Sequence, residues 1–112
     1  MSALEGIKVL DLTSMVSGPV AAMMLADQGA EVIKVERAGS GDPFRAFMDG
    51  SDSPHFRAYN KNKASVTIDL QSDEGKSALR ALLSDADVLL ENFRPGVMDR
   101  LGFSAETVAR DY

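Results

Sequence analysis

The sequence contains no cysteine and no tryptophan, and it has one histidine, His55, among 112 residues. The absence of cysteine excludes disulfide bonds, thiol catalysis and thiolate metal sites. A transition-metal site is not expected either, because such metals favour imidazole and thiolate ligands, and carboxylates alone would suit only Mg²⁺ or Ca²⁺. We therefore expect no metal cofactor.

Long apolar runs and targeting signals are also missing. No segment approaches the roughly 18 consecutive apolar residues of a membrane span. The amino-terminal residues MSALEGIKVLDL lack the basic region and apolar block of a secretory signal. We expect a cytoplasmic protein with no membrane partner. A net charge of −5 also argues against a nucleic-acid partner.

The composition, 45% apolar and 26% charged, is typical of one small globular domain. Its charge is unevenly distributed. Residues 34–63 carry six basic and four acidic side chains, whereas the segments on either side are acidic. This local positive bias suits a small anionic ligand, and scattered solvated charge is the alternative interpretation.

Strand-like and helix-like segments alternate along the chain. Apolar, β-rich segments predict strands over residues 7–12, 31–36, 65–70 and 86–91. Helical spacing predicts helices that are capped by Ser17 or Gly18, by Ser72 and by Ser104, the first ending at Gly29. This order predicts an α/β fold with a parallel sheet and helices on both faces.

Residues 38–63 interrupt the pattern and predict a long loop, which in a compact domain is usually functional. His55 lies in it, and we interpret it as a surface loop residue rather than a catalytic one. Asp11 and Glu36 end the first two strands and are candidates for catalysis by position, but capping or backbone binding is the preferred interpretation. We find no convincing acid/base pair.

The first strand-to-helix turn, DLTSMVSGPVAA, has a single glycine, so the G-x-G-x-x-G signature of NAD and flavin proteins is absent. No P-loop motif occurs either. The start of the following helix still offers unpaired N–H groups, which suit a phosphate. This is weak evidence for a phosphate site, because every helix start has such groups.

Basic, amide and aromatic residues recur where the predicted strands end. Arg37 follows the second strand, Asp69 and Gln71 end the third, and Asn92–Arg94 follow the fourth. In a parallel sheet these positions share one edge, where α/β folds bind ligands. Singly, each residue is best read as a turn or surface residue. Together they indicate a nucleotide-like ligand, with arginine for phosphates and Phe93 for a base.

Three stretches resemble a known family: GIKVLDLTSMVSGPVAAMMLADQGAEVIKVERAGSGDPFR, NKNKASVTIDLQSDEGK and ADVLLENFRPGVMDRLGF. In this order and spacing they are similar to the amino-terminal part of the family III CoA-transferases. That family includes formyl-CoA transferases, carnitine and bile-acid CoA-transferases, and α-methylacyl-CoA racemases.

The resemblance implies that residues 1–112 form the incomplete, amino-terminal part of a Rossmann-like large domain, and that the full-length protein is an interlocked homodimer. It implies acyl-CoA and a carboxylic acid as small-molecule substrates, with no NAD, flavin or metal. The CoA-binding residues implied by the resemblance are Val16, Ser17, Arg37, Ile68, Asp69, Leu70, Gln71, Asn92, Phe93, Arg94 and Arg100.

The resemblance places no catalytic residue in this chain. The family's catalytic aspartate, which forms a mixed anhydride, lies downstream, as do the His and Asp of the racemases, so His55 inherits neither role. Racemase-type or carnitine-type specificity and a truncated, non-catalytic fragment remain the alternatives. Ser14 and Val16 stand where some formyl-CoA transferases carry larger polar side chains, so formate is not the expected acyl group.

Overall fold

The computed structural model describes residues 2–47 and 53–112, and its centre is a four-stranded parallel sheet. The strand order is β3-β2-β1-β4, with Leu10 of β1 opposite Ile33 of β2 and Leu89 of β4. The strands are β1 (Lys8–Asp11), β2 (Glu31–Arg37), β3 (Lys63–Ile68) and β4 (Val88–Leu90). The prediction of an α/β fold with a parallel sheet is therefore confirmed.

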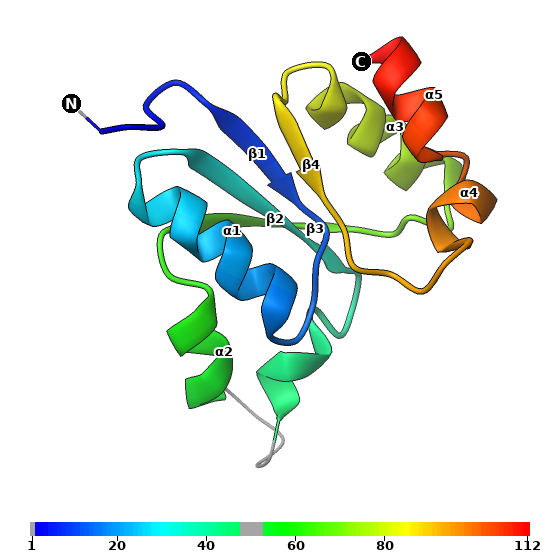
Figure 1. The fold of residues 1–112 in the computed structure, drawn as a ribbon. Helices are drawn as coiled ribbons and strands as arrows, with labels where there is room; N and C mark the ends of the chain where they lie inside the picture. The colour runs from blue at the N-terminus through cyan, green and yellow to red at the C-terminus, as the bar shows by residue number, and fades with distance from the viewer. Residues whose placement is uncertain (1, 48–52) are drawn as a thin grey trace.

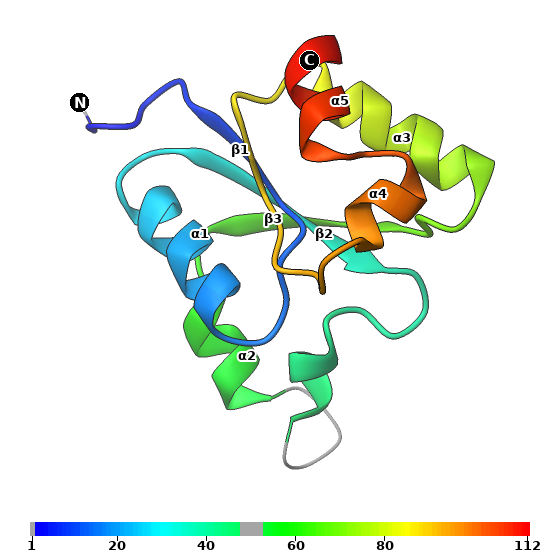
Figure 2. The same ribbon diagram turned by 45° about the vertical axis from the view of Figure 1, so that its right-hand side comes forward.

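Helices cover both faces of the sheet, as predicted (Figure 1). On one face lie α1 (Ser17–Asp27) and α2 (Pro54–Tyr59), and on the other lie α3 (Asp73–Leu83), α4 (Val97–Leu101) and α5 (Ala105–Asp111). The turned view separates the two layers and shows α4 beside the ends of the strands (Figure 2). Within the described residues, no helix is both long and apolar enough to span a bilayer.

The alternation of side chains along each strand divides the core into two halves. Val9 and Val32 pack with Ala22 and Ala26 of α1. On the other face the core consists of Leu10, Leu12, Val35, Ile68, Leu79, Leu83, Met98, Leu101 and Phe103. Because both faces are apolar, the strands read as continuous apolar runs in the sequence.

Most predicted helix ends are confirmed. Ser72 Oγ accepts a hydrogen bond from Gly75 N, Ser104 Oγ accepts one from Thr107 N, and Gly29 has the left-handed φ of 103° beyond α1. The predicted cap of α1 is wrong, since the helix begins at Ser17 after Val16, whose side chain has no polar atom to cap it.

The strand boundaries also differ from the prediction, most clearly for β3 and β4. β3 starts two residues early, at Lys63, because Asn62 has a φ of 66° and turns the chain into it. It ends before Asp69, whose side chain accepts a hydrogen bond from Gln71 N and forms a turn. β4 is limited to the three residues that pair with β1.

The prediction of a long loop over residues 38–63 is wrong for most of the segment that the structure describes; residues 48–52 lie outside the described residues. It contains a short 3₁₀-helix, η1 (Pro43–Ala46), as well as α2. Asp42 caps η1 and Ser53 caps α2, each directly before a proline. A capping residue followed by proline is a helix-start signal, and here it recurs twice.

Candidate functional site

A pocket of about 660 Å³ lies at the carboxyl ends of the strands. Its lining comes from the ends of β1, β2 and β3, from the segment between β2 and η1, from the segment after β4 and from α4. The lining residues are Leu12, Thr13, Ser14, Lys34, Val35, Glu36, Arg37, Ala38, Gly41, Asp42, Pro43, Ile68, Asp69, Leu70, Gln71, Phe93, Arg94, Val97 and Leu101. The pocket thus occupies the edge of the sheet where α/β folds bind ligands.

Two glycines let helices approach this edge closely. A Cβ built on Gly75 of α3 would lie 1.8 Å from the Asp69 carbonyl oxygen, and one built on Gly18 of α1 would lie 2.3 Å from Thr13 Cβ. Only glycine allows such contacts, because a side chain would have to displace the neighbouring residue. These glycines bring the first turns of both helices against the strand ends that line the pocket.

Seven of the eleven predicted site residues line this pocket: Arg37, Ile68, Asp69, Leu70, Gln71, Phe93 and Arg94. Arg37, Gln71 and Arg94 are exposed, whereas Ile68 is buried and Leu70 and Phe93 are partly buried. The pocket therefore combines an apolar wall with guanidinium groups at its rim, an arrangement that can hold a flat ring together with an anionic group.

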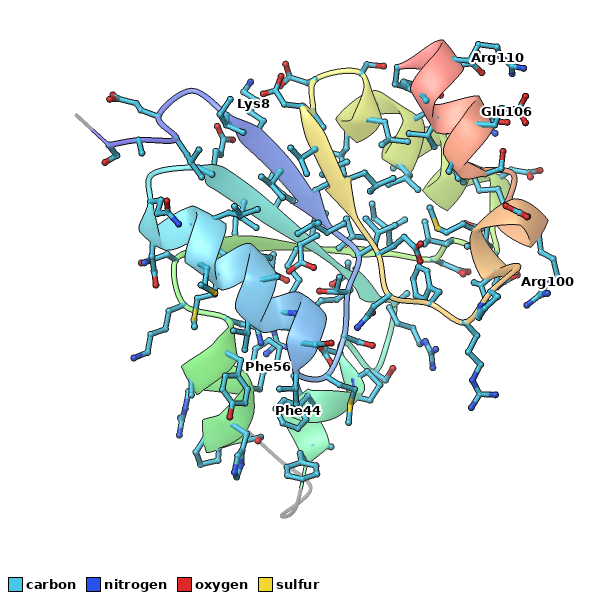
Figure 3. The ribbon with its side chains drawn as sticks, in the orientation of Figure 1. Lys8, Phe44, Phe56, Arg100, Glu106 and Arg110 are labelled. Atoms are coloured by element: carbon cyan, nitrogen blue, oxygen red, sulfur yellow. The ribbon has the colours of Figure 1, made fainter. Side chains whose placement is uncertain are left out.

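The other four predicted residues lie outside the lining. Val16 and Ser17 are exposed at the start of α1. Asn92 is engaged with the β1–α1 turn, because its Nδ2 donates to Ser14 O at 3.0 Å and its Oδ1 accepts from Ser14 N at 3.1 Å. Arg100 of α4 has an exposed side chain (Figure 3), and its guanidinium group lies beside Gly96.

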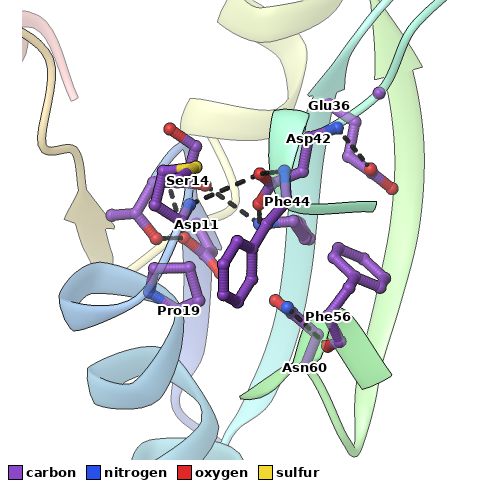
Figure 4. Close-up of polar contacts among 12 residues, drawn as sticks. Asp11, Ser14, Pro19, Glu36, Asp42, Phe44, Phe56 and Asn60 are labelled. Carbon is purple, nitrogen blue, oxygen red and sulfur yellow. Dashed lines mark hydrogen bonds and ion pairs between the residues drawn. The ribbon is translucent and has the colours of Figure 1, made fainter. Parts of the chain in front are cut away.

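Sequence reasoning missed the polar side chains on the second side of the pocket. Lys34 Nζ lies 2.9 Å from Asp42 Oδ2 and donates to Thr13 O at 2.9 Å. Asp42 Oδ1 accepts from Phe44 N and Met15 N. Figure 4 shows Asp42 between Ser14 and Glu36. The sequence offered one signal for this cluster, Asp42 directly before Pro43, which marks a helix start. Lys34 offered none, because a lysine inside an apolar strand does not reveal its partner.

A second lysine–aspartate pair lies on the same face of the sheet. Lys63 Nζ lies 2.8 Å from Asp11 Oδ2 and also donates to Pro19 O and Asn60 Oδ1. Burial lowers the pKa of Lys63, and the hydrogen bond with Asp11 opposes that effect. Asp11 Oδ1 accepts from Thr13 N, as the preferred interpretation of Asp11 predicted.

Of the six cations in residues 34–63, Lys34, Lys63 and Arg45 each form an ion pair within the protein. Arg45 donates from Nε and Nη2 to the carboxylate of Glu36, at 2.6 and 2.7 Å. The positive bias read from the sequence therefore overstates the charge offered to a ligand. Arg37 is exposed at the pocket rim and is the cation of this segment that is best placed to contact a ligand.

The Glu36 carboxylate is stabilised in its charged form. Burial raises its pKa, but hydrogen bonds from Arg45, Ser65 and the Asp42 N–H outweigh burial and lower the pKa from 4.5 to about 2. At neutral pH it is therefore ionised and fully engaged. Such a group holds structure and is a poor general base.

His55 lies in the first turn of α2, not in a loop, and its side chain is exposed. Its ring meets Phe44 and Phe47 edge-on, with centroids 5.9 and 5.2 Å away. Within the part of the chain that the structure describes, its side chain has no acid or base partner. Among residues 2–47 and 53–112, no group of three or more potential ligand side chains is arranged to hold a metal ion.

Comparison with known proteins decides the family. The family model described as CoA-transferase family III matches residues 4–111. The chain belongs to CoA-transferase family III. The family resemblance predicted from the three sequence stretches is therefore confirmed.

Curated relatives in this family include formyl-CoA:oxalate CoA-transferases. Those of Rhodopseudomonas palustris and Afipia carboxidovorans are 49% and 46% identical to this chain and cover 95% and 96% of it. An acyl-CoA transferase of Fusarium pseudograminearum is 41% identical over 95% of the chain. This family III chain spans about a quarter, 26%, of the length of each of these relatives.

Solved structures agree on the fold. A hypothetical protein from Mycobacterium tuberculosis matches 98% of this chain with a TM-score of 0.90 and 41% identity, over 31% of its own length. A CAIB/BAIF family protein from Brucella suis also has a TM-score of 0.90, with 35% identity over 97% of this chain and 30% of its own. The α/β arrangement is thus shared with both of these solved structures.

Proposed function

We propose that this chain is the CoA-binding segment of an acyl-CoA:carboxylate CoA-transferase. The observation that carries the proposal is the pocket at the strand ends, where Arg37 and Arg94 stand beside the apolar Ile68, Leu70 and Phe93. CoA has an adenine ring and anionic phosphates, which suit an apolar wall and guanidinium groups respectively. Membership of CoA-transferase family III supports the same ligand.

The chemistry belongs to residues beyond this chain. In the proposed reaction an aspartate attacks the acyl-CoA carbonyl and forms a mixed anhydride, and CoA thiolate leaves. The thiolate then attacks the aspartyl carbonyl of the anhydride, which forms an aspartyl-CoA thioester and releases the donor carboxylate. The acceptor carboxylate attacks this thioester and forms a second anhydride, and the released thiolate attacks the acceptor's acyl carbon, which forms the new acyl-CoA and frees the aspartate. Within the described residues the carboxylates with the strongest contacts, Asp11, Glu36 and Asp42, are all bonded inside the protein. We therefore assign this segment to binding.

The acyl group expected from the sequence differs from the acyl group in the names of the relatives. Ser14 and Val16 gave the expectation that formate is disfavoured, whereas the most similar curated relatives named above are formyl-CoA:oxalate CoA-transferases. We propose a carboxylate-to-carboxylate CoA-transferase as the class. Racemase-type and carnitine-type activities are alternatives that an assay with their substrates would reveal.

The first test is Arg37→Ala in the native protein, meaning these 112 residues with any that the gene adds. We expect CoA binding to weaken about ten- to a hundredfold, because an arginine–phosphate contact contributes roughly 1.5–3 kcal/mol. Isothermal titration calorimetry measures it. Arg110→Ala is the matched control, since Arg110 is exposed on α5 and lies outside the pocket lining. Unchanged affinity in Arg37→Ala would count against the site.

A second prediction concerns residues 1–112 alone. We expect this chain to show no CoA-transferase turnover with an acyl-CoA and an acceptor acid, because it spans about a quarter of its curated relatives and is proposed to lack the reacting aspartate. Thioester exchange followed by liquid chromatography measures turnover. Product formed by the purified chain would refute this assignment and would locate the nucleophile within these residues.

We further propose that the native protein is an interlocked homodimer in the cytoplasm. The proposal rests on family membership, and light scattering of the native protein tests the dimer. A monomeric mass would reject it. That this segment is one part of a larger CoA-binding domain likewise remains a proposal.

A further inference from the structure

The turn between β1 and α1, residues 12–16, is held by side chains from three other segments. Lys34 of β2 donates to Thr13 O at 2.9 Å, and Asp42 before η1 accepts from Met15 N at 3.3 Å. Asn92 after β4 bonds to both the N–H and the carbonyl of Ser14. Three consecutive residues of the turn are therefore each fixed by a side chain that is distant in sequence.

The conformation of this turn is unfavourable by itself. Met15 has a φ of 73°, in the left-handed region that a residue with a Cβ adopts at a cost of roughly 1–2 kcal/mol. Such residues persist only where their surroundings determine the conformation. The same turn supplies Leu12, Thr13 and Ser14 to the pocket lining. The residue with the unfavourable conformation thus directly follows the part of the turn that lines the proposed CoA site.

The ion pair that holds the turn is almost completely buried. The side chains of Lys34 and Asp42 are 2% and 1% exposed, and their charged atoms lie 2.9 Å apart. Burying two charges costs several kcal/mol for each ion, so that an apolar pair of similar size is often as stable or more stable. A gain in stability is therefore a weak explanation for this buried pair. Its contacts with Thr13 and Met15 indicate instead that it holds the turn in one conformation.

We propose that Lys34 and Asp42 are positioning residues, whose ion pair fixes the β1–α1 turn as a wall of the pocket and so sets the affinity for CoA. This inference rests on the proposed CoA-binding function of the pocket. The pair joins β2, the start of η1 and the turn in one buried contact. Without it, Met15 loses its tether and Thr13 loses a partner for its carbonyl.

The test compares Lys34→Met, Asp42→Ser and the double variant in the native protein. Serine keeps a side-chain oxygen to cap η1, but it is too short to replace the contacts with Lys34 and Met15. Each single variant leaves one buried charge unpaired and should lower the melting temperature. The double variant removes both charges and should melt above either single variant.

Binding of CoA separates positioning from a merely structural role. We expect the double variant to bind CoA about tenfold more weakly than wild type although its stability recovers, because small displacements of a site wall are costly. A double variant within about twofold of wild-type affinity would overturn the proposal. The control is Lys8→Met with Asp85→Ser, which removes an exposed lysine–aspartate pair outside the pocket and should leave affinity unchanged.

Hydrogen exchange of the CoA-free protein gives a readout that is independent of the ligand. We expect faster exchange at residues 12–16 in the double variant and not in the control. Unchanged exchange there would show that the ion pair does not hold the turn. If the wild-type protein binds no CoA, the proposed function fails, while the exchange data still decide whether the pair positions the turn.

Discussion

Replacing Glu36 with glutamine tests the buried polar network through its dependence on pH. The carboxylate accepts hydrogen bonds from two nitrogens of Arg45, from Ser65 Oγ and from Asp42 N. Burial raises the pKa of Glu36, and these bonds outweigh it, lowering the pKa from 4.5 to about 2. Glutamine has nearly the same shape, but its NH₂ group would face a donor where the carboxylate now accepts.

The size of the effect follows from the shift of the Glu36 pKa. A drop from 4.5 to about 2 corresponds to roughly 3 kcal/mol of stabilisation at neutral pH. The Arg45 side chain is 43% exposed, so water screens part of the interaction, and about 2 kcal/mol is the expected loss in Glu36→Gln.

The sign of the pH dependence follows because the folded pKa lies below the unfolded value. The stabilisation is complete above the unfolded pKa and is lost as pH falls through the folded pKa, with about half gone near pH 3. The gap between wild type and Glu36→Gln should therefore be largest at pH 7 and narrow toward pH 3.

Urea unfolding of the native protein, followed by circular dichroism at a series of pH values, measures this gap. Glu31→Gln is the matched control, because Glu31 begins the same strand with an exposed side chain, and we expect a change within about 0.5 kcal/mol. A gap for Glu36→Gln that is absent at pH 7, or that stays constant as the pH falls, would refute the assigned role of the carboxylate.

Two further predictions concern packing. Gly75→Ala should lower the free energy of unfolding by about 2 kcal/mol, although alanine favours helices, because its Cβ would overlap the Asp69 carbonyl at 1.8 Å. Ser77→Ala in the same helix is the control. An increase in the melting temperature of Gly75→Ala would contradict the contact. Leu79→Ala should lower the free energy of unfolding by about 2–5 kcal/mol, because Leu79 is fully buried in the larger core. Chemical denaturation measures this loss. A loss below about 1 kcal/mol would contradict the prediction and show that the surrounding side chains collapse into the cavity.

Much of the fold was predictable from local pattern. Apolar runs on β1 and β2 predict a sheet covered on both faces, and Ser72 and Ser104 predict helix starts that the structure confirms. The start of α1 was predicted wrongly because no side chain marks it. The segment containing η1 and α2 was read as a loop because its helices are too short for apolar periodicity, although Asp42–Pro43 and Ser53–Pro54 signal both starts.

For the candidate site, the sequence by itself determined that the strands run parallel and therefore which residues stand at one edge, such as Arg37, Gln71 and Phe93. Only the tertiary structure decided which polar groups face a ligand and which face each other. Lys34 and Lys63 look like ligand cations in the sequence, yet each is buried against an aspartate from another segment. The physical reason is that charge pairing depends on distances across the sheet, whereas sequence periodicity records only the face of each strand.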